Sequence, residues 1–104
     1  MAWVLLFIAA AFETVWAISL KESDGFSRLG PSLLFGVTVV ASMVLLALAL
    51  RDLPVGTAYA VWTGTGAVGA AVVGMVLLGE SAAIGRILPI SLIAAGIVWL
   101  ALVE

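Results

Sequence analysis

The sequence predicts an all-α integral membrane protein with four transmembrane helices. Of its 104 residues, 65% are hydrophobic and only 10% are charged, and the mean hydropathy is +1.37. A water-soluble domain carries about 25% charged residues, so this chain cannot cover a soluble core with polar side chains. The apolar residues also fall into four long runs that are divided by short polar breaks. This pattern is typical of a multi-pass membrane protein.

Each apolar run has the length that a membrane-spanning helix needs. The hydrocarbon core of a bilayer is about 30 Å thick, and roughly 20 residues of α-helix cross it. We expect the helices at about residues 3–20, 32–50, 55–78 and 84–103. With their connections they form a single transmembrane domain over residues 1–104.

The three polar connections are short, which predicts that successive helices run antiparallel. The first, residues 21–28, combines turn formers with charged side chains. Pro31 follows it and suits the first turn of a helix, where its missing N–H group has no helical partner. The second connection covers residues 51–56 and the third residues 79–85.

Composition excludes several classes of function. The net charge is −2, so there is no basic surface for nucleic acid. The chain has no Cys and no His, which rules out disulfides, zinc sites and histidine proton relays. We therefore expect neither a metal nor a cofactor, and the chemistry is left to carboxylates, hydroxyls, aromatic rings and the backbone.

Basic residues near the helix ends set the orientation only weakly. Lys21, Arg28 and Arg86 belong to one side of the membrane, and Arg51 with the terminal amine to the other. Because Lys and Arg in short loops determine topology, a bias this small predicts a mixed, dual-topology population. A single orientation with a modest bias is the alternative.

Glu13 is the acid that lies in the middle of an apolar run, between Ile8 and Ile18. A charged carboxylate at the centre of a membrane helix costs at least about 2.5–3.5 kcal/mol. Such a group faces a protein interior or a water-filled cavity and marks an ion or substrate path. The alternative is a protonated acid that makes a hydrogen bond between helices.

Aromatic and hydroxyl side chains extend the candidate site around Glu13. Trp16 shares a helical face with Glu13 and offers a π face to a cation or an indole N–H to the carboxylate. Tyr59 and Trp62 share a face of the third helix. Ser42 and Thr38 on the second helix are hydroxyls that suit either a ligand or their own backbone carbonyls. The set describes a box for a small planar cation with several N–H donors.

One carboxylate that binds either a proton or a cation is sufficient for exchange. Desolvation favours the neutral carboxyl group and a bound cation favours the carboxylate, so the two ligands compete for Glu13. If the protein changes its open side only when occupied, an inward proton gradient drives the cation outward. An antiparallel homodimer brings two copies of Glu13 to one site and creates the inverted symmetry that is common in transporters.

Gly64 and Gly66 lie beside the aromatic cluster of the third helix. Paired glycines loosen a helix enough to bend, which predicts a hinge at this point. Close packing against a neighbouring helix is the alternative explanation.

Sequence motifs along the whole chain resemble the small multidrug resistance family, and within it the guanidinium exporters. They are Phe12-Glu13-Thr14-Val15-Trp16-Ala17, the first connection through Pro31-Ser32, the run 53–64 that contains Tyr59-Ala60-Val61-Trp62-Thr63-Gly64, and Gly79-Glu80-Ser81-Ala82. The resemblance implies a transporter rather than an enzyme. It implies a dual-topology, antiparallel homodimer that exchanges protons for cations across the bacterial inner membrane.

The resemblance also implies roles for individual residues. Glu13 would bind guanidinium and the proton, Ser42 and Trp16 would orient its carboxylate, and Tyr59 and Trp62 would frame the pocket. The fourth helix would supply the main dimer contact at Ala95 and Gly96. Trp16 and Thr63 favour the guanidinium exporters, because the quaternary-ammonium exporters usually have Gly and Ser at these two positions.

Departures from the family pattern leave alternatives open. Thr65 occupies a usually aliphatic position, Glu22 adds an acid to the first connection, and the fourth helix lacks a basic residue near its end. A multidrug exporter of quaternary ammonium ions is the nearest alternative. A small ion channel, a rotor-type proteolipid and one subunit of a heteromeric pair are the others.

Overall fold

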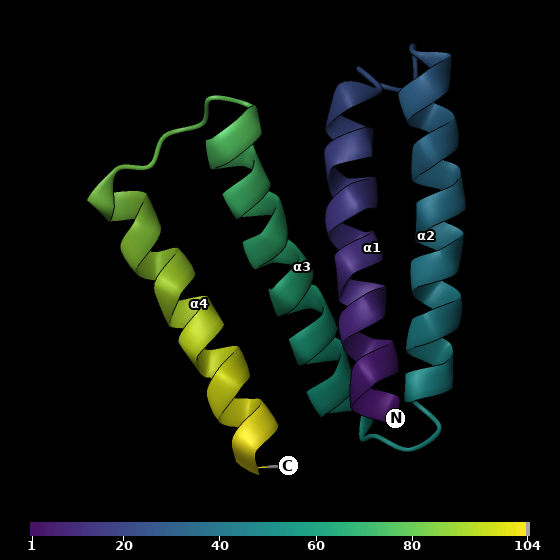
Figure 1. Cartoon of the computed structure of the whole chain (residues 1–104), viewed down its shortest axis with the longest axis vertical. Coiled ribbons are helices and arrows are strands. Elements are labelled where there is room, and N and C mark those ends of the chain that lie inside the picture. Colours follow the sequence, from purple (N-terminus) through teal and green to yellow (C-terminus); the bar gives the residue numbers. More distant parts are fainter. Residues whose placement is uncertain (104) are drawn as a thin grey trace.

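The computed structural model describes residues 1–103 as four helices: α1 (Ala2–Glu22), α2 (Leu29–Ala49), α3 (Val55–Leu77) and α4 (Ile84–Val103) (Figure 1). Each is long and apolar enough to cross a membrane. The prediction of four membrane-spanning helices is therefore confirmed. Glu104, the last residue of the expected domain, lies outside the described residues.

Helix α2 begins one turn before the expected residue 32. Gly30 and Pro31 form part of its first turn, where the missing N–H group of a proline breaks no helical hydrogen bond. Arg28 precedes the helix with an extended backbone. Helix α3 follows Pro54, also extended, and it ends at Leu77.

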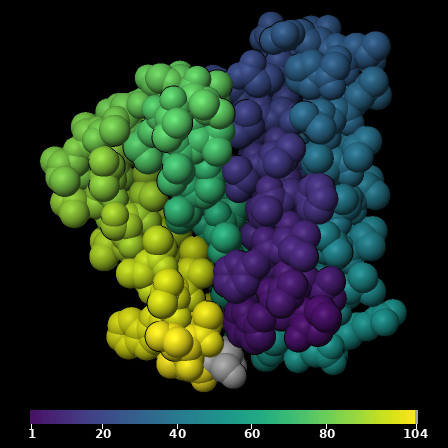
Figure 2. Space-filling model, in the orientation of Figure 1, coloured from purple at the N-terminus to yellow at the C-terminus, as the bar shows by residue number. Residues whose placement is uncertain are grey.

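The helices lie side by side in a thin layer with principal extents of 40 × 34 × 16 Å. The first and third connections lie at one end of the layer, and both termini and the second connection lie at the other (Figure 1). Helices α1 and α2 pack along their length, whereas α3 meets α1 near one end and leans away from it toward the other. Helix α4 packs chiefly against α3 and forms the edge of the layer (Figure 2).

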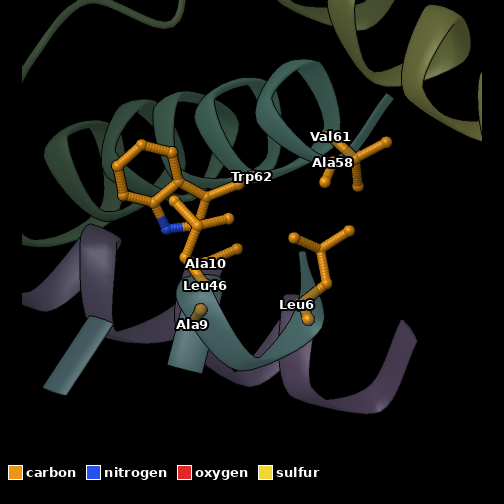
Figure 3. Packing of buried hydrophobic residues seen from close by; sticks show 8 residues of the cluster. Leu6, Ala9, Ala10, Leu46, Ala58, Val61 and Trp62 are labelled. Carbon is orange, nitrogen blue, oxygen red and sulfur yellow. The ribbon is translucent and has the colours of Figure 1, made fainter. Parts of the chain in front are cut away.

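The buried core lies where α1, α2 and α3 meet (Figure 3). It contains Leu6, Ala9, Ala10, Leu46, Ala49, Ala58, Val61 and Trp62. Small residues such as these alanines let membrane helices approach closely. Trp62 is 4% exposed and fills the space that the alanines leave. This junction holds three of the four helices in fixed positions.

The end of α3 is closed by a backbone motif that uses glycine. Gly79 has a φ of +70°, and the amides of Leu78 and Glu80 both donate to the carbonyl of Gly74, each at 3.1 Å. A left-handed residue directly after a helix, with such returning hydrogen bonds, is the usual glycine C-cap. The cap turns the chain sharply and brings Glu80 back alongside the helix.

Candidate functional site

Glu13 lies at the contact between α1 and α3 and is only 9% exposed. Its carboxyl group rests directly against the backbone of Gly66, where any Cβ atom would overlap the carboxyl carbon. Within residues 1–103 no hydrogen-bond partner reaches its buried Oε1 atom. Most buried polar atoms in proteins have a partner, so an unpaired carboxyl oxygen at this depth needs an explanation such as a ligand or a proton.

Thr14, the next residue, ties α1 to α3 at the same level. Its hydroxyl lies 3.2 Å from the carbonyl oxygen of Gly66 and 3.4 Å from that of Ala10 in its own helix. The single hydroxyl proton serves one of these acceptors at a time. The hydroxyl also rests on Gly69, where a Cβ atom would lie 3.2 Å from the Thr14 Cβ. Gly66 and Gly69 together form the flat surface against which Glu13 and Thr14 pack.

Ser42 and Trp62 form a buried hydrogen-bond chain that joins three helices. The Trp62 indole Nε1 donates to the Ser42 hydroxyl at 3.0 Å, and that hydroxyl donates to the carbonyl of Ala9 at 2.7 Å. Figure 3 shows the indole nitrogen turned toward Ala10 and Leu46. Ala9 lies one helical turn from Glu13 on the same face of α1. These two hydrogen bonds therefore hold the part of α1 that carries Glu13.

Trp16 points toward α2 rather than toward the carboxyl group of Glu13. Its ring makes an edge-to-face contact with Phe35, with ring centroids 5.8 Å apart and an interplanar angle of 83°. The buried Nε1 atom of Trp16 has no hydrogen-bond partner in the described chain. Within one chain, Ser42 does not donate to Glu13, because its hydroxyl donates to the carbonyl of Ala9. Trp16 does not donate to Glu13 either. The orienting roles that the resemblance implies stay predictions.

Tyr59 lies next to Trp62, but at the surface. The two ring centroids are 5.5 Å apart at 52°, and Tyr59 is 56% exposed. Of the two aromatic rings of the expected pocket, that of Trp62 is thus buried and that of Tyr59 is exposed. The hydroxyl of Thr38, in contrast, donates to the carbonyl of Leu34 in its own helix at 2.6 Å. This is the backbone hydrogen bond that the sequence offered as the alternative to ligand binding.

The remaining predicted site residues lie on α3 and α4. Helix α3 continues unbroken through Gly64 and Gly66, so the hinge stays a prediction. Close approach accounts for both glycines, because a Cβ on Gly64 would lie 2.8 Å from the Ile97 side chain of α4. Ala95 and Gly96 are exposed on α4.

A cavity of about 410 Å³ opens where α3 leans away from α1. Ala17, Ala67, Ala70 and Ala71 line it on these two helices. Ala17 and Ala70 each lie one turn beyond the contact between Glu13 and Gly66. Lys21, Glu80 and Arg86 line the same cavity at its outer end. The cavity therefore extends from charged groups at the end of the layer to a level one helical turn from Glu13.

Sequence reasoning missed Thr14 and the charged outer end of this cavity. A hydroxyl inside a helix normally bonds to its own backbone, so Thr14 gave no separate signal. The spacing of Gly66 and Gly69 by three residues was the available sign of a close helix contact. The hydroxyl oxygen of Thr65 is also buried and has no hydrogen-bond partner among residues 1–103, beside a cavity of about 210 Å³ that α1, α3 and α4 line. Within residues 1–103 no three acidic side chains gather to hold a metal ion.

Comparison with known proteins places this sequence in a family. Residues 1–93 match the family model described as Small Multidrug Resistance protein. A guanidinium exporter from Yersinia pseudotuberculosis is 60% identical over 102 residues, which cover 98% of each chain. Guanidinium exporters from Salmonella typhimurium and Citrobacter freundii are 56% and 55% identical, and the alignments cover 98% of this chain and 97% of theirs. This chain, with its four apolar helices, belongs to the small multidrug resistance family.

Proposed function

We propose that this protein exports guanidinium and small substituted guanidinium ions across the bacterial inner membrane in exchange for protons. The observation that carries the proposal is the buried carboxyl group of Glu13, with an unpaired oxygen, in a chain 55–60% identical to guanidinium exporters. Guanidinium is planar, and its N–H groups can give two parallel hydrogen bonds to one carboxylate. A carboxylate in a low-dielectric site favours such a cation strongly, because water does not screen the pair.

Protons and guanidinium compete for the same carboxyl group in this proposal. On the side with more protons Glu13 becomes neutral and releases the cation. On the side with fewer protons the carboxylate is restored and binds the next cation. An inward proton gradient therefore drives guanidinium outward, provided that the site changes sides only when it is occupied.

A second copy of the chain, inserted in the opposite orientation, completes the site. Three features of the single chain support this part of the proposal. In the described part of the chain, Glu13 and Trp16 each keep a buried polar atom without a hydrogen-bond partner, Tyr59 is exposed, and α4 has no buried residue. A partner helix laid on α4 at Ala95 and Gly96 would use small residues for close approach. The weak charge bias allows both orientations.

Guanidinium-driven proton movement in proteoliposomes tests this function. We expect guanidinium to move protons through the wild-type protein, Glu13→Gln to be silent, and tetrapropylammonium not to be transported. Glu22→Gln is the matched control, because Glu22 lies at the end of the same helix and forms only a surface ion pair with Arg28 at 3.8 Å.

Two results would contradict the proposal. Full coupling in Glu13→Gln would remove the carboxylate from the mechanism. Equal transport of tetrapropylammonium would instead support a multidrug exporter of quaternary ammonium ions, the alternative that the sequence leaves open.

A further inference from the structure

The outer end of the cavity between α1 and α3 carries a second carboxylate, Glu80, which the proposed transport cycle does not yet use. Glu80 and Arg86 form an ion pair, and both line the cavity whose inner end lies one turn from Glu13. Lys21 lines the same cavity from α1. A cation that reaches Glu13 through this cavity must pass these three charged groups.

The backbone positions Glu80 beside the end of α3. The glycine cap at Gly79 returns the Glu80 amide to the carbonyl of Gly74 at 3.1 Å. The side chain then lies over Gly74, where a Cβ atom would be 2.7 Å from the Glu80 carboxyl carbon. The Glu80 side chain is 37% exposed, so it remains accessible.

Arg86 uses only one of its two terminal nitrogens to pair with this carboxylate. Its Nη2 atom contacts Oε1 of Glu80, while its Nη1 atom donates to the carbonyl of Ser81 at 3.0 Å. The two arms of the guanidinium group are therefore divided between two acceptors. A free guanidinium ion has no side chain to constrain it and can bond to both carboxylate oxygens side by side, which is the stronger arrangement.

We propose that Glu80 is a second, weaker guanidinium site, at which the transported ion replaces the Arg86 side chain on its way to or from Glu13. The proposal rests on the proposed export of guanidinium. Arg86 presents the same chemical group as the substrate, so the exchange keeps the carboxylate paired throughout. Lys21 lies on the facing wall of the same cavity, on α1.

A purely structural role for the ion pair makes a different prediction. If Glu80 and Arg86 only connect α3 to α4, removing either partner breaks the same contact and has the same effect. If Glu80 binds the substrate, Glu80→Gln removes the site, whereas Arg86→Gln removes its competitor. The two substitutions then act in opposite directions.

The test measures the guanidinium concentration that gives half-maximal proton movement in proteoliposomes of the full-length protein. Exposed ion pairs are worth little, so we expect shifts of about threefold, upward for Glu80→Gln and downward for Arg86→Gln. Lys21→Gln is the matched control, because it removes an equal charge from the facing wall without freeing a carboxylate. We expect it to shift the value less than Arg86→Gln does.

The double variant isolates the exchange at Glu80. In a Glu80→Gln background, Arg86→Gln should lose its effect, because there is no carboxylate left to free. Shifts in the same direction for both single variants would overturn the proposal. So would an Arg86→Gln effect that equals that of Lys21→Gln and persists in the double variant.

A binding measurement separates this proposal from the transport function. NMR titration of Glu13→Gln protein with guanidinium should detect weak binding that a further Glu80→Gln substitution removes, whether or not the wild-type protein transports guanidinium. Equal binding by the two variants would overturn the second site. Absence of guanidinium-driven proton movement in the wild-type protein would instead overturn the proposed function.

Discussion

Two neighbouring levels of the same helices differ in how their polar groups are paired. At the core, two hydrogen bonds run from Trp62 through Ser42 to Ala9, and they pair both the indole N–H and the serine hydroxyl. Further along α1, Glu13 and Trp16 each keep a buried polar atom that has no hydrogen-bond partner within residues 1–103. Buried polar groups that are fully paired stabilise one packing, whereas unpaired ones mark a place where something else binds. The first level is scaffold, and the second is the candidate site.

Of the substitutions that compare the two levels, Gly66→Ala is expected to have the largest effect, because it changes the packing around the unpaired carboxyl group of Glu13. A Cβ at this position would overlap the Glu13 carboxyl group, so either the carboxyl group or α3 must move. Overpacking of this kind costs about 1–3 kcal/mol. We expect guanidinium-driven proton movement to fall severely while the protein still inserts in the membrane.

Gly36→Ala is the control for this substitution, because a Cβ at Gly36 meets no atom of residues 1–103 within 4 Å. It should leave transport close to that of the wild type. Full transport by Gly66→Ala would show that Glu13 does not need its position against α3.

Ser42→Ala removes the hydroxyl at the centre of the paired level and should lower the free energy of unfolding. It leaves the indole N–H of Trp62 and the carbonyl of Ala9 without their shared partner. A buried group left unpaired costs about 1–3 kcal/mol, which the free energy of unfolding in mixed micelles will measure. Ser32→Ala is the control, because the hydroxyl of Ser32 bonds to the carbonyl of Arg28 at the edge of the molecule. Equal losses for the two variants would contradict the scaffold role of Ser42.

The smallest effect is expected for Thr14→Val, which removes the hydroxyl contact between α1 and α3 at the level of Glu13. The packing against Gly69 is kept, and only the hydrogen bond to the carbonyl of Gly66 or Ala10 is lost. We expect a loss of about 0.5–1.5 kcal/mol in the free energy of unfolding. Thr14→Ser, which keeps the hydroxyl, should restore most of it. If Thr14→Ser is as unstable as Thr14→Val, the hydroxyl contributes nothing.

Hydropathy alone was sufficient to predict the helices, because each run of apolar residues must satisfy its backbone within the membrane. Glu13 was also identifiable, since a carboxylate in the middle of such a run is costly. The hydrogen-bond partners of Ser42 and Trp62 could not be identified from the sequence, because they depend on how each helix is rotated about its axis. Glu80 appeared in the sequence as one more solvated acid in a connection, and only the glycine cap at Gly79 places it at the cavity.

The most direct test of the central claim is the affinity for guanidinium at a series of pH values, followed by the fluorescence of the tryptophans. If proton and cation compete for Glu13, the affinity falls as the pH falls, by up to about tenfold for each pH unit once the carboxyl group is mostly protonated. Glu22→Gln should keep this dependence. An affinity that stays constant while the protein remains folded would contradict the competition at Glu13 and, with it, the exchange mechanism.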